Sequence, residues 1–308
     1  MDRNSIPHTQ PHQSTSRKLG FEFLDEAVGW VEKLIQKRIK AVEADSGILD
    51  GCNMPFCKID DIKLYYEDWG VKGQVPLIFL HGVMGSSEIW KPQVDHFKNQ
   101  RRVTILDLRG HGQSDKPLGK YSIAQFSDDL HSFMKNLDIE KAVIVGHSLG
   151  GMTALRFTLD HQDMVDKLIL IDTTAKASSS FRTKLLLSLS KILMDVSYRS
   201  FLKIYLSRYS DLKEIDLEEA IAKLLKTPRY VTKSCFSAIA GFDVTSELAN
   251  IRVPTLIIHG RESSTPLVLA EYMNEHIPQA ELVIIEGAGH ASPKENPDEI
   301  WKAIEKFI

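Results

Sequence analysis

Short, almost wholly apolar runs alternate with amphipathic stretches along most of this chain. The apolar runs are PLIFL (76–80), RVTILDL (102–108), KAVIVG (141–146), KLILID (167–172), PTLIIHG (254–260) and ELVIIEG (281–287). A strand that is apolar on nearly every residue is buried on both faces, as in a parallel sheet with helices on either side. The sequence therefore predicts an α/β fold with a mostly parallel central sheet flanked by helices.

The alternation of strands and helices is preceded by a predicted hairpin and interrupted once by a segment without strands. Residues 56–69 alternate well enough to predict a hairpin with its turn near Asp60 and Asp61. Helices are expected near 88–98, 122–137 and 149–159, from about 266, and over 298–308. Between 176 and 246 no strand-like run occurs, and several helix-like runs replace it. We expect one sheet, built from 51–175 and 247–308, interrupted by an all-helical insert over 176–246.

The N-terminal 50 residues have a different composition. Residues 1–18 are polar and rich in Ser, Gln, His and Pro, which predicts a disordered tail. Residues 19–50 carry apolar side chains at helical spacing, which predicts an amphipathic helical extension. Packing of this helix on the main body is the simpler expectation, and docking on a membrane or a partner is the alternative.

Charge and cysteine content narrow the classes of function. The formal net charge of −3 gives the 308-residue chain no general attraction to nucleic acid or membranes. Three cysteines cannot build a disulfide framework and have no metal-site spacing, although a Cys52–Cys57 bridge is conceivable. We find no signal-peptide pattern and no apolar run of about 20 residues. The expected location is cytoplasmic.

Residues 146–150, GHSLG, fit the G-x-S-x-G pattern of a nucleophile elbow. The simpler explanation is a tight glycine turn in which Ser148 is incidental. However, the strand predicted before the motif and the helix predicted after it are the context that this motif requires, because small residues let the chain turn sharply and present the hydroxyl. Ser148 is therefore the candidate nucleophile.

A serine nucleophile needs a base and a site for the developing negative charge. His290 directly follows the last predicted strand, where a loop can carry an imidazole to the carboxyl edge of the sheet. The backbone N–H groups of Leu149 and Val83 are the expected oxyanion-hole donors. Met84 is the alternative to Val83.

Five motifs in order, HGVMGSSEIW, LDLRGHGQSD, GHSLGG, VPTLIIHG and GAGHASPKENP, resemble those of the α/β-hydrolases with a helical cap. The resemblance covers about residues 55–308 and implies that Ser148 is the nucleophile, His290 the base, Val83 and Leu149 the oxyanion hole, and 176–246 the cap. In such proteins LDLRGHGQSD shapes the rim of the active site. We therefore interpret Asp107, Arg109 and His111 as structural.

The acid of the triad departs from the family pattern. The family usually places Asp three residues after the glycine that ends the penultimate strand, and this chain has Ser263 there. Asp172, at the end of KLILID, and Glu262 remain as candidates, and both preserve the order Ser, acid, His. We favour Asp172, because the tip of a strand holds a carboxylate more rigidly than a loop does. Asp172 could also simply cap the start of the loop.

The expected activity is that of a serine hydrolase cleaving carboxylic esters with an apolar acyl part, without a metal or organic cofactor. Lactonase, thioesterase, amidase, C–C hydrolase and cofactor-free perhydrolase chemistry use the same groups and stay open. A non-catalytic ligand-binding protein on the hydrolase fold is the alternative from another class.

Residues 176–240 hold twelve Lys/Arg against six Asp/Glu. Solvated helix faces explain this excess of positive charge most simply, and attraction of an anionic substrate or a membrane is the alternative. The sequence does not determine the oligomeric state.

Overall fold

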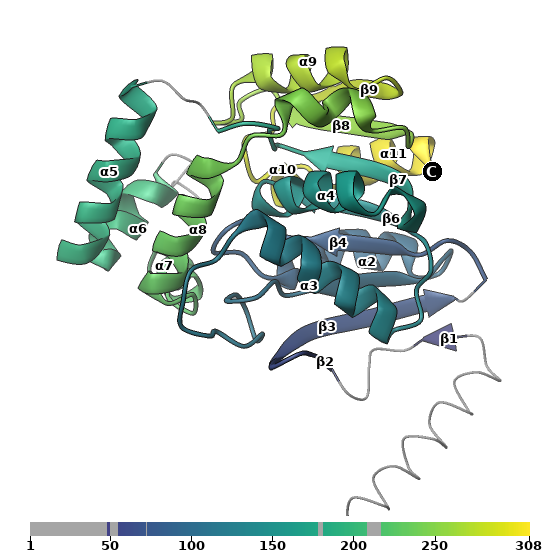
Figure 1. Ribbon diagram of the computed structural model, residues 1–308, viewed down its shortest axis with the longest axis horizontal. Helices are drawn as coiled ribbons and strands as arrows, with labels where there is room; N and C mark the ends of the chain where they lie inside the picture. The colour runs from purple at the N-terminus through teal and green to yellow at the C-terminus, as the bar shows by residue number, and fades with distance from the viewer. Residues whose placement is uncertain (1–47, 50–54, 72, 178–180, 208–216) are drawn as a thin grey trace, which may run out of the picture. The chain divides into compact units, whose positions relative to one another are not determined.

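A nine-stranded sheet runs through the part of the chain that the computed structural model describes, which is residues 48–49, 55–71, 73–177, 181–207 and 217–308. The strands are β1 Ile48–Leu49, β2 Phe56–Ile59, β3 Ile62–Val71, β4 Leu77–Leu80, β5 Val103–Leu106, β6 Ala142–His147, β7 Val165–Ile171, β8 Thr255–Gly260 and β9 Ala280–Ile285. Their order is β1-β3-β5-β4-β6-β7-β8-β9, and β2 pairs with β3 (Figure 1). The predicted tail and nearly all of the predicted helical extension lie outside the described residues.

The N-terminal edge of the sheet is antiparallel and the rest is parallel. β2 and β3 form the predicted hairpin, with Ile59 paired to Ile62 across a turn at Asp60 and Asp61. β3 runs antiparallel to β5, and all pairs from β5 to β9 are parallel. β1 also pairs antiparallel with β3, so residues 48–49 of the region assigned to the helical extension are a short strand. No apolar alternation over two residues could have indicated it.

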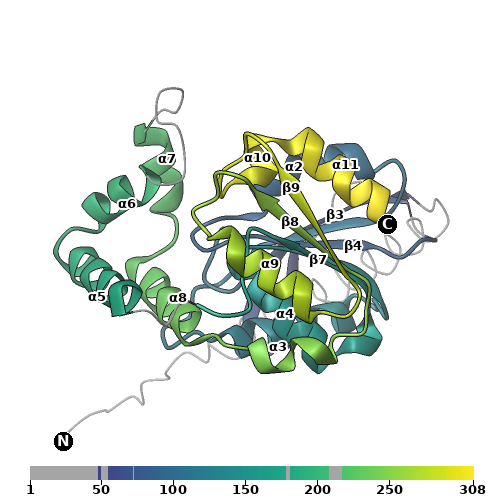
Figure 2. The same ribbon diagram turned by 90° about the horizontal axis from the view of Figure 1, so that it is seen from above.

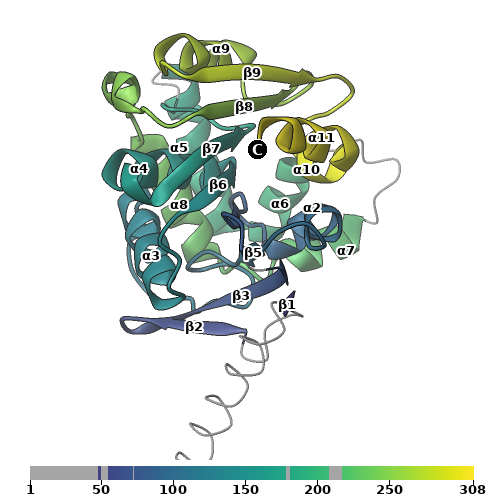
Figure 3. The same cartoon turned by 90° about the vertical axis from the view of Figure 1, so that its right-hand side faces the viewer.

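The parallel strands bury both faces, as their apolar composition predicts. Alternate residues of β4 point to opposite sides: Ile78 and Leu80 belong to one apolar cluster, Leu77 and Phe79 to the other. The helices α3 Ile123–Asn136, α4 Leu149–Asp160 and α9 Leu267–His276 cover the first face, and α2 Lys91–Phe97 and α11 Pro297–Phe307 cover the second (Figure 3). None of the helices in the described ranges combines the length and apolar character that crossing a bilayer requires.

The carboxyl ends of the parallel strands lie at one edge of the sheet. Residue pairs across the sheet align the ends of neighbouring strands, among them Leu80 with Gly146 and His147 with Ile171. Loops leaving these ends meet at this edge, which is where open α/β sheets bind their ligands. Any site built from several strands is therefore expected here.

The insert between β7 and β8 is helical in its described part. It contains α5 Phe181–Val196, α6 Tyr198–Leu206, α7 Leu217–Leu224 and α8 Arg229–Gly241. These helices stand together to one side of the sheet (Figure 2). The two ends of the insert are fastened to each other: Ala177 N–H donates to the carbonyl of Phe242 at 3.1 Å, Val244 N–H donates to that of Ala175 at 2.9 Å, and Lys176 pairs with Asp243 at 2.6 Å.

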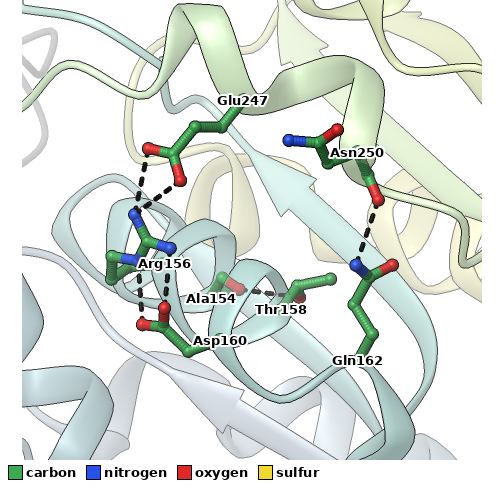
Figure 4. A network of polar contacts seen from close by, with 7 residues as sticks. All are labelled: Ala154, Arg156, Thr158, Asp160, Gln162, Glu247 and Asn250. Atoms are coloured by element: carbon green, nitrogen blue, oxygen red, sulfur yellow. Dashed lines mark hydrogen bonds and ion pairs between the residues drawn. The ribbon is translucent and has the colours of Figure 1, made fainter.

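Polar contacts attach the chain returning from the insert to α4 (Figure 4). Arg156 pairs with Asp160 on its own helix at 2.7 Å and with Glu247 of the following 3-10 turn Thr245–Asn250 at 3.1 Å. Gln162 donates to the carbonyl of Asn250 at 3.0 Å. Exposed ion pairs contribute little stability. Their value here is positional, because they fix where the chain re-enters the sheet.

Candidate active site

Ser148 occupies the turn between β6 and α4 in a backbone conformation with φ +52° and ψ −114°. Residues other than glycine rarely adopt this region of φ and ψ, and here the surrounding contacts hold Ser148 in it. The Ser148 N–H donates to the carbonyl of Ile171 at 3.0 Å, and its carbonyl accepts the Thr173 hydroxyl at 2.7 Å. A Cβ on Gly150 would lie 2.3 Å from the carbonyl oxygen of Leu80, so the helix can begin this close to β4 only with glycine there. Ser148 therefore lies at the carboxyl edge of the sheet, directly after β6.

His290 lies in the loop between β9 and the short helix α10 Ser292–Glu295, with its Nε2 3.1 Å from Ser148 Oγ. Residues 142 positions apart in the sequence thus stand at hydrogen-bond distance. The preceding residue of the elbow, His147, donates its Nε2–H to the His290 carbonyl at 2.7 Å and so holds the loop in place. Sequence reasoning missed His147, because the second position of G-x-S-x-G gives no signal of its own.

Burial chiefly, and the neighbouring imidazoles of His147 and His259, lower the pKa of His290 well below its usual range. The ring is therefore neutral near pH 7, which leaves one nitrogen able to accept a proton. If Nδ1 carries the hydrogen, Nε2 faces Ser148 as the acceptor. That is the arrangement a general base requires.

The Nδ1 atom of His290 faces two hydroxyl groups. Ser263 Oγ and Thr265 Oγ1 each lie 3.2 Å from it, on the loop that follows β8. Neither residue was predicted to act at the site. Ser263 nevertheless had a signal, because it stands where the family usually has its acid.

Asp172 directly follows β7 and is buried, in a conformation with φ +46°. Its carboxylate accepts hydrogen bonds from the Gly260 N–H at 3.0 Å and from the Ser292 hydroxyl. Burial raises the pKa of Asp172, while His147 and then the hydroxyl of Ser292 and the amide of Gly260 oppose that rise.

Glu262, the alternative acid, is exposed. Its backbone N–H donates to the carbonyl of Ala288 at 3.0 Å. Of the two candidates, the structure thus embeds Asp172 in the polar network around the imidazole and leaves Glu262 at the surface.

The loop after β4 passes directly over the elbow. A Cβ on Gly82 would lie 3.2 Å from the Cβ of Ser148, so glycine permits this close approach. Val83 follows Gly82, and Leu149 is the first residue of α4. Among the residues that the structure describes, none provides a backbone acceptor for the amide of either Val83 or Leu149. Backbone N–H groups that have no backbone acceptor and lie beside a nucleophile are the donors that an oxyanion hole uses.

The LDLRGHGQSD segment supports this loop, consistent with its interpretation as structural. Asp107 accepts the backbone amides of Ser87 at 2.6 Å and Gln113 at 2.7 Å. Arg109 forms a two-pronged ion pair with Asp129 at 2.6 and 2.7 Å. These contacts join the segment to the 3-10 turn at Ser87 and to α3.

The helices of the insert contribute an apolar cover beside the loop. Met84 packs into a cluster with Met194, Phe201, Leu202 and Ile221, and Val83 packs against that cluster. In contrast, the side chains of Leu189, Ile192 and Ile204 in the same insert are exposed. The described residues contain no group of three or more His, Cys, Asp or Glu that could hold a metal ion.

Three comparisons place this geometry among known proteins. A family model described as alpha/beta hydrolase fold matches residues 75–297. The AB hydrolase superfamily protein YisY of Bacillus subtilis is 31% identical over 80% of this chain and 96% of its own. The 3-oxoadipate enol-lactonase 2 of Acinetobacter baylyi is 26% identical over 80% of this chain and 94% of its own. A thermophilic esterase from Thermogutta terrifontis superposes with a TM-score of 0.72 at 26% identity, covering 83% and 97% of the two chains.

Proposed function

The chain belongs to the α/β-hydrolase family, and from this premise we propose that it is a serine hydrolase that cleaves carboxylic esters through an acyl-enzyme on Ser148. The observation that carries the proposal is the 3.1 Å contact between Ser148 Oγ and His290 Nε2 at the strand-to-helix turn. A nucleophile beside a neutral base is the pattern of covalent acyl transfer.

In this mechanism Ser148 Oγ attacks the ester carbonyl and its proton passes to His290 Nε2. The amides of Val83 and Leu149 stabilise the oxyanion of the tetrahedral intermediate. The imidazolium then protonates the departing alkoxide. Water, deprotonated by His290, attacks the acyl-enzyme; the bond from the acyl carbon to Ser148 Oγ breaks, the imidazolium returns its proton to Oγ, and the carboxylic acid is released. Asp172 is the proposed acid, because a buried negative charge near the ring stabilises the imidazolium formed in both steps.

The proposed substrates are small esters with an apolar acyl part. The cluster around Met84 and Phe201 supports this, because it brings apolar side chains from the insert against the loop that carries Val83. The named relatives add a second candidate, a lactonase, since one is called an enol-lactonase and another an esterase. A lactone is a cyclic ester, so the same groups would open it.

A fluorophosphonate probe tests the proposal. We expect stoichiometric labelling of the wild-type protein and none of Ser148→Ala. The same two proteins, assayed on p-nitrophenyl esters of graded chain length, on lactones and on thioesters, assign the substrate class. Absence of labelling and of turnover in the folded wild-type protein would refute the proposal and favour a ligand-binding protein on the same fold.

A further inference from the structure

The loop from Gly260 to Thr265 is fixed to its surroundings at several points. Gly260 N–H donates to Asp172 Oδ1, and Ser263 N–H donates back to the Gly260 carbonyl at 3.0 Å. The Thr265 carbonyl is 2.9 Å from His259 Nε2. The hydroxyls of Ser263 and Thr265 are therefore presented by an ordered turn, and both face the same nitrogen of His290.

The hydrogens in this network can be assigned from the heavy atoms. Thr265 Oγ1 lies 3.4 Å from the backbone carbonyl of Asp172, an acceptor only, so the hydroxyl donates there and can accept from His290 Nδ1–H. Ser263 Oγ accepts the Thr265 amide at 3.4 Å and is 3.2 Å from Nδ1. With Nδ1–H as its second donor, the Ser263 hydroxyl hydrogen remains to point at the Asp172 carboxylate.

We propose that Ser263 and Thr265 are positioning residues whose hydroxyls accept Nδ1–H of His290. Ser263 donates onward to the carboxylate of Asp172 and Thr265 to its backbone carbonyl, so the acid acts on the base through the Ser263 hydroxyl. This inference rests on the proposed function. It explains how a chain with Ser at position 263 retains an oriented base. The bridge selects the tautomer with Nδ1 protonated, which leaves Nε2 free to accept the proton of Ser148.

The charge of Asp172 is coupled to this bridge. Burial raises the pKa of Asp172, and the Ser263 hydroxyl is among the groups that counteract the rise by hydrogen bonding to the ionised form. A hydroxyl that stabilises the carboxylate on one side and accepts from the imidazole on the other passes part of the charge to the ring. Because the bridge is neutral, it should support the imidazolium less strongly than a carboxylate in contact.

The test uses variants of the full chain at position 263. Ser263→Ala removes the bridge, Ser263→Thr keeps a hydroxyl, and Ser263→Asp puts a carboxylate beside Nδ1. Ser264→Ala is the matched control, because Ser264 is the exposed neighbour in the same loop. The readouts are kcat and KM on a p-nitrophenyl ester, the pH profile of kcat/KM, and thermal melting as the check on folding.

We expect Ser263→Ala to lower kcat about tenfold with little change in KM. A tenfold change is what the loss of one hydrogen bond to a group that becomes charged should cause. Ser263→Thr should stay within about threefold of wild type, by the same reasoning. Ser263→Asp should move the acid limb of the profile to higher pH, because an adjacent carboxylate raises the pKa of the imidazole. It should also restore activity to an Asp172→Asn protein. Ser264→Ala should leave every readout unchanged.

Wild-type kcat and an unshifted profile in folded Ser263→Ala would overturn the inference while leaving the proposed function intact. If Ser263→Ala is inactive and neither Thr nor Asp at 263 recovers activity, the bridge is also refuted, because the residue then acts only in folding. A wild-type protein that is neither labelled nor active refutes the proposed function, and the inference with it. Thr265→Val tests the second hydroxyl in the same way, with a severalfold loss of kcat expected and no loss counting against its role.

Discussion

Replacing Ser148 by glycine should stabilise the protein relative to Ser148→Ala, although both variants lack the nucleophile. A residue with a side chain at φ +52°, ψ −114° stores about 1–3 kcal/mol of backbone strain, which glycine does not. Glycine in turn loses about 0.5–1 kcal/mol through the greater freedom of its unfolded chain. The balance favours Ser148→Gly by about 1 kcal/mol, or roughly 1.5 °C in Tm for a chain of 308 residues.

Thermal unfolding followed by circular dichroism measures the difference, with urea titrations as a second measure of the free energy of unfolding. A control pair, Ser237→Ala and Ser237→Gly, lies in an exposed part of α8, where glycine should instead be less stable than alanine by about 1 kcal/mol. The predicted sign therefore inverts between the two sites. If Ser148→Gly melts at or below Ser148→Ala while the control behaves as expected, the strain argument is wrong.

Three further outcomes follow from the same contacts. Burial lowers the pKa of His81 to about 4, and its Nε2 accepts the Leu108 amide at 3.0 Å. Below pH 6.5 the unfolded chain therefore binds more protons than the folded one, so the free energy of unfolding should fall by up to about 1.4 kcal/mol per pH unit from pH 6.5 towards pH 4. A free energy of unfolding from urea titrations that does not change over this pH range would contradict the argument. Because burial chiefly lowers the pKa of His290, kcat/KM should hold its plateau below pH 6.5, and an acid limb centred at or above 6.5 in a pH–rate profile would count against a neutral buried base. Asp172→Asn should lower kcat/KM on the order of 100-fold and Glu262→Gln less than about twofold in steady-state assays, and the reverse ranking would identify Glu262 as the acid.

The alternation of apolar strands and amphipathic helices was sufficient to predict the sheet and the helices around it. β4, β6 and β8 are buried on every residue, and that burial requires the same uninterrupted apolar runs that made them visible in the sequence. Elements with weaker signals were missed. β1 is two residues long and α10 is four, and over such lengths no periodicity can develop.

The candidate site was predictable where backbone geometry restricts residue choice. Ser148 could be found because the elbow needs small neighbours such as Gly146 and Gly150, and His290 because it follows the last strand. The network behind the ring could not be found in this way. Asp172, Ser263 and Thr265 meet only after β7 and β8 pair, and isolated hydroxyl residues in loops are too common to indicate a function.

The fastening at the base of the insert has a consequence for how such a protein can diversify. Because Ala175, Ala177, Phe242 and Val244 bond to one another, the chain departs from the sheet and rejoins it at a single closed junction. The strands, the elbow and the histidine loop are complete on the near side of that junction. The lengths of the helices beyond it can therefore vary without moving the ends of β7 and β8, provided that the contacts of the insert with Met84 are kept.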